Sequence, residues 1–246
     1  MAVEFNHVTF TYEGAGASSL SDITFQAKKG QTIGIIGGTG SGKSTLVSLI
    51  PRFYDVTDGK ITIDGKDIRN VSQHELREKL GYVPQKAVLF SGDIASNILY
   101  GNPDGSEAEM TEAATIAQAT EFIEQKKKKY KSTISQGGSN VSGGQKQRLS
   151  IARAIAKHPD VYIFDDSFSA LDYKTDATLR AKLKEKTAES TVMIVAQRIS
   201  TILHADQIIV LDDGQIVGKG THKELLKNCE AYYQIASSQL SEKELE

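Results

Sequence analysis

The chain has 246 residues, with 29 Lys or Arg against 31 Asp or Glu, so its formal net charge is −2. This length allows a sizeable core without a disulfide or metal scaffold, and the single Cys229 excludes an internal disulfide. A pI of about 6.2 supplies no basic field of the kind that a sequence-independent nucleic-acid binder needs, so we expect no nucleic-acid partner.

Alternating apolar and polar residues predict an N-terminal antiparallel sheet. They run through Val3–Phe10, Ile23–Ala27 and Lys60–Ile63. No window approaches the ~18 uncharged apolar residues that cross a bilayer. The N-terminus has neither the basic start nor the apolar run of a secretory signal, so we expect a cytosolic chain.

A second set of strands is apolar on both faces, which is typical of a parallel sheet covered by helices. These runs are Thr32–Ile36, Val161–Phe164, Val192–Val195 and Gln207–Leu211. Helical patterns at Ala108–Ala117, Thr120–Gln125 and Gly143–Ala156 separate the first run from the others. We therefore expect a single domain, 1–246, in which an α/β core (1–85 and 157–246) is split by a helical insert (about 86–156).

A glycine-rich loop follows the apolar run Thr32–Ile36 and precedes the helical run Thr45–Ile50. It reads Gly37-Gly38-Thr39-Gly40-Ser41-Gly42-Lys43-Ser44, which fits G-x-x-x-x-G-K-[ST] in the strand–helix context that this motif requires. Its N–H groups can converge on phosphate oxygens, Lys43 can reach the β/γ phosphates and Ser44 can bind Mg²⁺. A dinucleotide-binding loop fits less well, because Lys43 stands where the third glycine belongs. Thr45 is expected at the same nucleotide site.

Two acidic residues, Asp165 and Asp166, follow the apolar strand Val161–Phe164. We expect a carboxylate at this strand end to lie beside the glycine-rich loop, or P-loop, where Asp165 can hold Mg²⁺ through its water shell. The alternative interpretation is a strand-end turn with solvated acids.

The stretch Asn140-Val141-Ser142-Gly143-Gly144-Gln145-Lys146-Gln147-Arg148 opens a helix shortly before that strand. Ser142 and Gln145 could form a capping box that needs no ligand, but this leaves the paired glycines unexplained. Here the sequence closely resembles the nucleotide-binding domain of ABC transporters, whose signature reads L-S-G-G-Q. The resemblance implies that Ser142, Gly143, Gly144 and Gln145 contact ATP held by a second nucleotide-binding domain.

The resemblance extends from Val3 to about Leu240, with the motifs in the family's order. Tyr12 matches the aromatic residue that stacks on adenine, and Gln85 matches the glutamine that touches Mg²⁺ and the attacking water. Ser169-Ala170-Leu171-Asp172 matches the loop that crosses the dimer interface.

The sequence segments at residues 89–94 and 194–200 resemble those of the exporter branch of the family. The resemblance thus implies a P-loop (RecA-like) core with an antiparallel β subdomain and a helical subdomain, and ATP and Mg²⁺ as cofactors. It also implies an ATPase motor at the cytoplasmic face of the membrane that contacts the transmembrane domains of an exporter.

Catalytic positions depart from the family pattern. The family has Asp-Glu where this chain has Asp165-Asp166, so the catalytic carboxylate is one methylene shorter, and Gln197 replaces the switch histidine. Gln136 stands where exporters carry Glu. With Gln85, Asp166 and Gln197 are the expected catalytic residues, and the pattern resembles the degenerate half of a heterodimeric exporter whose partner supplies an intact Glu and His.

Two other classes of function compete with this interpretation. A nucleotide-gated regulatory module would close on ATP with negligible hydrolysis of its own. Chromosome or DNA-repair ATPases share the signature, but they place a long coiled coil between P-loop and signature, and residues 46–140 lack sustained heptads.

Overall fold

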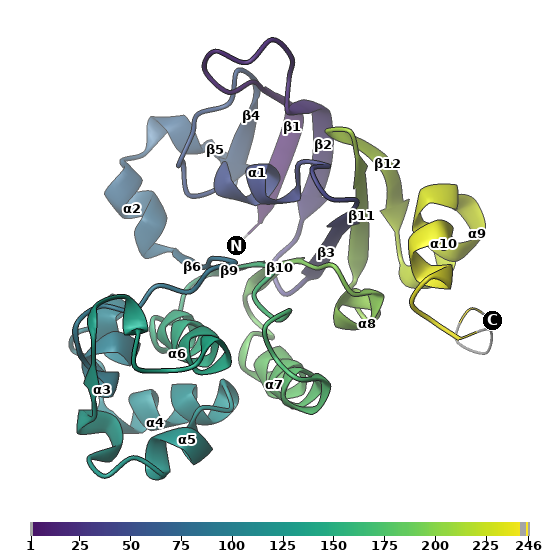
Figure 1. Cartoon of the computed structure of the whole chain (residues 1–246). Helices are drawn as coiled ribbons and strands as arrows, with labels where there is room; N and C mark the ends of the chain where they lie inside the picture. Colours follow the sequence, from purple (N-terminus) through teal and green to yellow (C-terminus); the bar gives the residue numbers. More distant parts are fainter. Residues whose placement is uncertain (1, 242–244, 246) are drawn as a thin grey trace.

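Six strands form the central sheet of the computed structural model, which describes residues 2–241 and 245 (Figure 1). Their order is β12 (Gln215–Gly220), β11 (Gln207–Asp212), β3 (Thr32–Gly37), β10 (Thr191–Val195), β9 (Val161–Asp165) and β6 (Leu80–Val83). All neighbours are parallel except β12, which pairs antiparallel with β11. Residues 1, 242–244 and 246 of the expected domain 1–246 lie outside the described residues.

A smaller antiparallel sheet packs on one side of the central sheet. Its order is β2 (Leu20–Ala27), β1 (Val3–Phe10), β4 (Asp58–Ile63) and β5 (Lys66–Asp67). Side chains of β1 alternate between the interior and the surface, and Phe5 stacks on Phe25 of β2 with ring centroids 4.6 Å apart. The expected N-terminal antiparallel sheet is confirmed.

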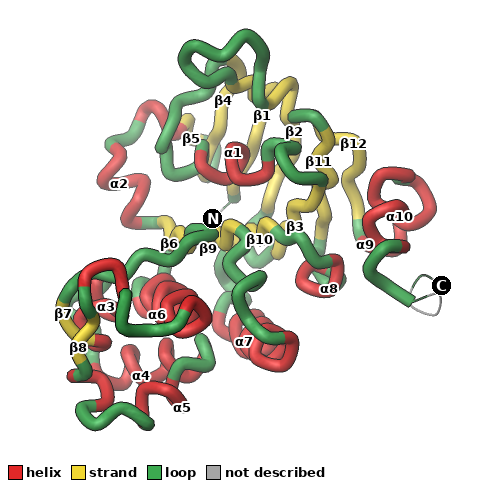
Figure 2. Tube along the Cα trace, in the orientation of Figure 1, coloured by secondary structure: helices red, strands yellow, loops and turns green. Residues whose placement is uncertain are grey.

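Helices occupy most of the chain between β6 and β9, as Figure 2 shows. This segment contains α3 (Ile94–Ile98), α4 (Glu107–Ile116), α5 (Thr120–Glu124) and α6 (Gly143–Ala156), with the short pair β7 (Gly92–Asp93) and β8 (Thr133–Ile134). The remaining helices are α1 (Lys43–Ser48), α2 (Gln73–Glu78), α7 (Tyr173–Lys186), α8 (Ile199–Ile202), α9 (His222–Asn228) and α10 (Glu230–Ser237). Short 3₁₀ turns lie at Ile68–Asn70, Leu99–Gly101, Lys129–Lys131 and Gln136–Gly138.

The central sheet buries both of its faces. Along β9, Val161 and Ile163 pack with the small sheet and α1, whereas Tyr162 and Phe164 pack with the helices on the other side. This alternation divides the apolar interior into two clusters separated by the sheet. The arrangement confirms the expected α/β class and explains why β9 and β10 are buried along their whole length.

The carboxyl ends of parallel strands meet at one edge of a sheet, and ligands of open α/β sheets bind there. At this edge β3 leads into the glycine-rich loop, β9 ends in Asp165, β10 leads to Gln197 and β6 leads to Gln85. The topology therefore brings together residues that lie far apart in the sequence.

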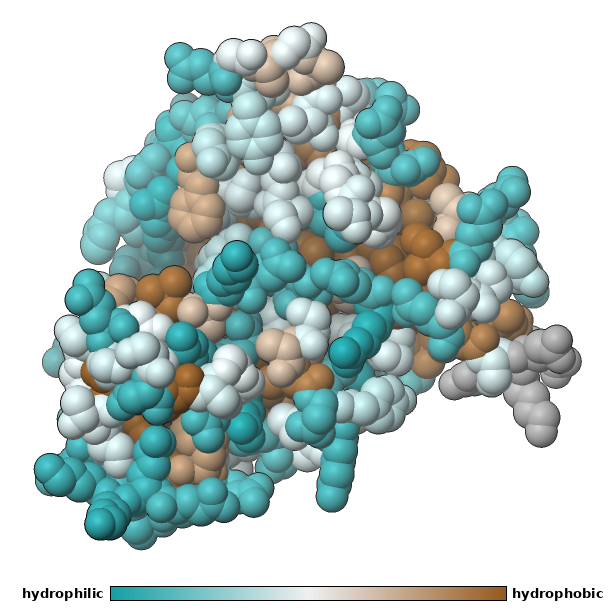
Figure 3. Space-filling view, viewed as in Figure 1, coloured by the Kyte–Doolittle hydropathy of each residue, from teal (hydrophilic) through white to brown (hydrophobic). Residues whose placement is uncertain are grey.

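The surface of the face drawn in Figure 3 is mostly hydrophilic, with apolar residues at the hollow between the strands and the C-terminal helices. Within the described part of the chain, no helix is long and apolar enough to cross a bilayer. Cys229, between α9 and α10, is buried and unpaired with another cysteine.

Candidate functional site

The glycine-rich loop connects β3 to α1 and turns back on itself with Gly40 and Gly42 at positive φ, 80° and 99°. Gly37 has no room for a side chain, because a Cβ there would lie 2.1 Å from the carbonyl oxygen of Leu211 on β11. Only glycine allows this close approach of backbone to backbone. The tight loop thus depends on packing against β11 as well as on its own turns.

Lys43, the first residue of α1, folds its side chain back over the loop. Its Nζ donates hydrogen bonds to the carbonyl oxygens of Gly37 at 2.9 Å and Gly38 at 2.7 Å. Burial lowers the pKa of this ammonium group, and the nearby carboxylates of Asp166 and Asp165 oppose that shift. A phosphate in the loop would offer Lys43 a charged partner in place of two neutral carbonyls.

Ser44 and Asp165 meet at the end of the loop. The Ser44 hydroxyl donates to Oδ1 of Asp165 at 2.8 Å, and the Tyr82 hydroxyl donates to Oδ2 at 3.2 Å. Burial raises the pKa of Asp165, whereas these two hydrogen bonds oppose the rise. Burial and the Asp165 charge raise the pKa of Tyr82, which keeps Tyr82 a hydrogen-bond donor. Tyr82 was not among the residues expected at the site.

Two amide side chains contact the neighbouring Asp166. We call Gln85, Asp166 and Gln197 the Asp166 cluster. Its Oδ2 accepts hydrogen bonds from Nε2 of Gln85 at 3.0 Å and Nε2 of Gln197 at 2.5 Å. Asp166 has φ +47°, an uncommon conformation for a residue with a side chain, and its side chain is buried. The three residues expected to be catalytic therefore form one hydrogen-bonded group.

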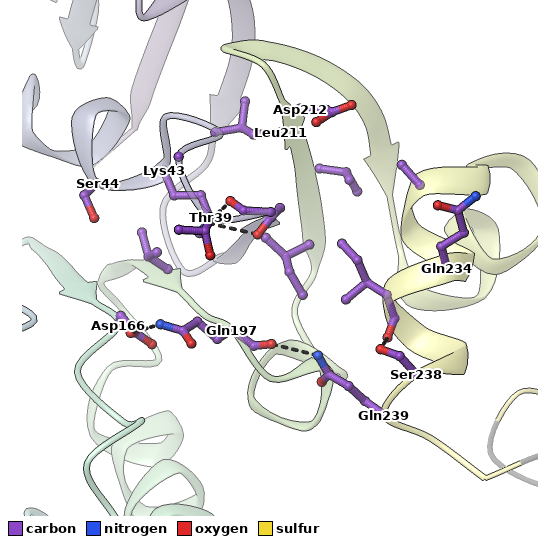
Figure 4. A pocket seen from close by; sticks show the side chains of 18 of the residues that line it. Thr39, Lys43, Ser44, Asp166, Gln197, Leu211, Asp212, Gln234, Ser238 and Gln239 are labelled. Carbon is purple, nitrogen blue, oxygen red and sulfur yellow. Dashed lines mark hydrogen bonds between the residues drawn. The ribbon is translucent and has the colours of Figure 1, made fainter.

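These residues line a pocket of about 670 Å³, in which Lys43, Asp166 and Gln197 face one another (Figure 4). The opposite wall comes from the end of α10 and the turn after it. This wall comprises Gln234, Ile235, Ser238 and Gln239. Sequence reasoning missed it, because no motif marks the C-terminal helices.

Tyr12 lies beside the small sheet, next to α1. Its hydroxyl hydrogen-bonds to the Thr45 hydroxyl at 2.9 Å, and its ring meets Phe10 and Tyr54 edge-on at 4.7 and 5.2 Å. Tyr54 is 47% exposed, so this aromatic group reaches the surface. The hydrogen bond to Thr45, the residue after Ser44, thus helps to hold the Tyr12 ring in place.

The expected signature segment lies elsewhere, at the start of α6. Ser142 caps the helix: the Gln145 N–H donates to its Oγ at 3.2 Å, and the Gln145 side chain accepts from the Ser142 N–H at 3.1 Å. The capping box is confirmed. A Cβ at Gly143 would meet no atom within 4 Å, and residues 142–145 do not line the pocket of the glycine-rich loop. Gly143 therefore leaves open space at the start of α6, outside this chain's own pocket, whereas a Cβ at Gly144 would lie 3.4 Å from the carbonyl oxygen of Ala170.

Ser169 to Asp172 connect β9 to α7. The Ser169 hydroxyl donates to the backbone carbonyl of Asp166 at 2.9 Å, and Asp172 caps α7 by accepting from the Thr175 N–H at 3.0 Å. This loop is therefore anchored at one end to the same acidic residue that Gln85 and Gln197 contact.

The oxygen atoms of Ser44 and Asp165 suit a nucleotide bound with Mg²⁺. The hydroxyl of Ser44 and the carboxylate of Asp165 are hard oxygen donors that already meet at 2.8 Å beside the glycine-rich loop. Among the described residues, no group of three or more His, Cys, Asp or Glu could hold a metal alone. Magnesium sites completed by phosphate oxygens need only one or two protein carboxylates, as here.

Fold and site together define a P-loop nucleotide-binding protein. The family model described as "ABC transporter" matches residues 20–169, and the chain belongs to this family. Its resemblance to ABC ATP-binding domains is thereby confirmed.

Two relatives and one solved structure illustrate the similarity. An uncharacterized ABC transporter ATP-binding protein of Mycobacterium tuberculosis is 49% identical over 234 residues, which are 94% of this chain and 40% of that protein. The ABC transporter ATP-binding protein YfiB of Bacillus subtilis is 45% identical over 96% of this chain and 41% of its own length. The structure of a bacterial Atm1-family ABC exporter with ATP bound matches with a TM-score of 0.93 and 37% identity, covering 98% of this chain and 42% of that one. The chain thus spans about two fifths of these proteins.

Proposed function

We propose that this chain is the ATP-driven motor domain of a membrane exporter, which binds MgATP and closes on a second nucleotide-binding domain. The observation that carries the proposal is the pocket lined by the glycine-rich loop, Gln85, Asp166 and Gln197, with Asp165 bound to Ser44 beside the loop. The similarity to an ABC exporter over 98% of the chain supports the exporter branch.

In this proposal the glycine-rich loop binds the phosphates of ATP. Lys43 leaves the carbonyl oxygens of Gly37 and Gly38 for the β and γ phosphates, and Ser44, Asp165 and Gln85 hold Mg²⁺. A Mg²⁺ ion held there would supply positive charge to offset the charge on the phosphates. Tyr12 stacks on the adenine, next to Thr45 at the start of α1.

In this proposal Asp166 orients the attacking water, but its carboxylate has a short reach. A base must lie within about 2.6–3.2 Å of its water, and the carboxylate of Asp is one methylene shorter than that of Glu. Its Oδ2 also accepts two amide hydrogen bonds, from Gln85 and Gln197. Gln197 can donate to the γ-phosphate as a neutral group but cannot become a cation as histidine can. This site therefore hydrolyses ATP slowly.

The second site of the assembly is completed by this chain's signature. Because residues 142–145 do not line the chain's own pocket, the exposed Ser142 and Gly143 are available to ATP held by another subunit. We infer a heterodimer partner with an intact catalytic Glu and His, together with transmembrane domains at the cytoplasmic face of the membrane. In this arrangement 1–85 and 157–246 act as the core and about 86–156 as the helical subdomain of one domain.

A nucleotide-gated regulatory module is the second candidate. The hydrogen bonds within the Asp166 cluster favour it, because the amides of Gln85 and Gln197 both bind the carboxylate that would have to accept a proton. Such a module closes on ATP and releases its partner with negligible hydrolysis of its own.

One pair of measurements tests the proposal. Isothermal titration calorimetry should detect MgATP binding that Lys43→Ala weakens strongly, and steady-state ATPase should give slow turnover that Lys43→Ala abolishes. Binding without turnover, even with a competent partner domain, would favour the regulatory module. Absence of MgATP binding to the folded chain would contradict both candidates.

A further inference from the structure

The side chain of Gln239 bridges the C-terminal turn and the switch loop, which we define as residues 196–198 between β10 and α8. Its Nε2 donates to the backbone carbonyl of Gln197 at 2.9 Å, and its Oε1 accepts from the backbone N–H of Ile199 at 2.8 Å. Figure 4 shows Gln239 reaching Gln197 from the wall opposite the glycine-rich loop. Both polar ends of one amide thus bind the junction of the switch loop and α8, about 40 residues earlier in the sequence.

This bridge supplies a cap that α8 lacks locally. The first N–H groups of a helix have no partner within the helix and need one from elsewhere. Arg198 precedes α8 and makes no side-chain capping bond, whereas Gln239 accepts from Ile199, the first residue of the helix. The C-terminal turn therefore fixes the start of α8.

The same bridge extends to the catalytic carboxylate. Gln197 is held by Gln239 through its backbone carbonyl and contacts Oδ2 of Asp166 through its own side chain. A shift of the Gln197 backbone would move its amide away from Asp166. Gln239, Gln197 and Asp166 thus form a continuous series of hydrogen bonds from the C-terminal turn to the site.

The turn that carries Gln239 is itself well anchored. The N–H groups of Gln239 and Leu240 both donate to the carbonyl of Ala236, at 3.0 and 2.8 Å. In α10, Tyr232 and Ala236 are completely buried. A firmly packed helix therefore presents the Gln239 amide, although the residue itself lies at the surface.

We propose that Gln239 is a positioning residue that holds the switch loop so that Gln197 faces Asp166 and the γ-phosphate. The role of Gln197 toward phosphate rests on the proposed function, whereas the clamp of Gln239 on the switch loop does not. In this proposal Gln239 acts through the backbone of Gln197.

Amide hydrogen exchange tests the clamp without ATP. In Gln239→Ala, the Ile199 amide should exchange about two- to tenfold faster than in the unmodified chain, the effect of losing one hydrogen bond. Gln239→Glu keeps an acceptor for Ile199 and should restore most of the protection. Ser237→Ala is the matched control, because Ser237 is exposed at the end of the same helix and its hydroxyl donates to the carbonyl of Gln234 in that helix. Unchanged Ile199 exchange in Gln239→Ala would overturn the proposal.

ATPase kinetics test the consequence for the site. Gln239→Ala and Gln239→Glu should both lower kcat about two- to tenfold, since both lose the donor to Gln197, with the affinity for MgADP nearly unchanged. Ser237→Ala should leave kcat as it is. Equal kcat values for all four proteins would overturn the positioning role. If the unmodified chain shows no ATPase, the proposed function fails on that result, while the exchange experiment still decides the clamp.

Discussion

Gln197 and Asp166, the two residues that depart from the family's catalytic pattern, contact each other directly: the amide of Gln197 donates to Oδ2 of Asp166. Gln85 donates to the same oxygen. The two departures therefore belong to one arrangement, in which a short carboxylate is matched by a neutral amide that can approach it. A change at one position alters the environment of the other.

Restoring the family's residues should raise ATP turnover. Asp166→Glu advances the carboxylate by about 1 Å, and an error of this size can cost about a hundredfold in rate, ~2.7 kcal/mol in barrier. Gln197→His adds an imidazole that can hold the γ-phosphate and the water. Because the residues touch, we expect the double variant to exceed the product of the single effects.

The assay is steady-state ATPase of the unmodified chain, both single variants and the double variant, at concentrations that permit pairing. MgATP affinity should barely change, because Lys43, Ser44 and Asp165 are untouched. Turnover of tens per second in the unmodified domain would show that Asp166 is already an adequate base.

Tyr12→Ala should weaken the binding of adenine nucleotides while the fold is preserved. Stacking of a base on an aromatic ring contributes about 1–3 kcal/mol, so the affinity for ADP should fall by about five- to a hundredfold. Tyr12→Phe keeps the ring and loses only the hydrogen bond to Thr45, so it should retain most of the affinity. Calorimetry that gives equal ADP affinity for Tyr12→Ala and the unmodified chain would assign Tyr12 to the surface aromatic group alone.

The isolated chain should be monomeric without nucleotide. In the proposed assembly each composite site needs the glycine-rich loop of one subunit and the signature of another, and residues 142–145 do not line this chain's own pocket. Detached from membrane helices, two such domains also lose the tether that raises their effective concentration. Light scattering at micromolar concentration should give the monomer mass, with weak association on addition of ATP. A stable dimer in nucleotide-free buffer would argue against ATP-driven closure.

The sequence predicts the elements and motifs that are marked by consecutive residues, and it misses those that depend on tertiary packing. Strands β9 and β10 are buried along their whole length, so their apolar runs were recognisable. In contrast, β12 has no fully buried residue, and the buried residues of α7 are only Asp176, Leu179 and Leu183, so neither carries a clear pattern.

The contacts of Gln239 also depend on tertiary packing and could not be predicted from the sequence. Gln239 reaches Gln197 across 42 residues, and only the packing of α10 determines where its side chain lies. Tyr82 likewise belongs to no motif, yet the pairing of β6 with β9 brings its hydroxyl to Asp165. Such contacts have no local signal, whereas the glycine-rich loop is specified by eight consecutive residues.

Asp165 should make the nucleotide-free protein less stable at neutral pH than a neutral residue would. Burial raises the folded-state pKa of Asp165 above its ordinary value of 3.8, so the charged carboxylate disfavours folding. The cost is fully present above the raised pKa and is lost as the pH falls from that value through 3.8. Asp165→Asn should therefore raise Tm at about pH 8 by about 2–4 °C, the shift that ~1 kcal/mol gives in a domain of this size.

The advantage of Asp165→Asn should shrink as the pH is lowered through the raised pKa of Asp165, because the native carboxyl then takes up a proton. Tyr82→Phe sharpens the test. The Tyr82 hydroxyl opposes the rise in the pKa of Asp165, so its removal should move this pH dependence to higher pH. Thermal unfolding of the three proteins across the pH range measures both effects, and a Tm difference between Asp165→Asn and the unmodified chain that does not vary with pH would show that ionisation of Asp165 is not its cause.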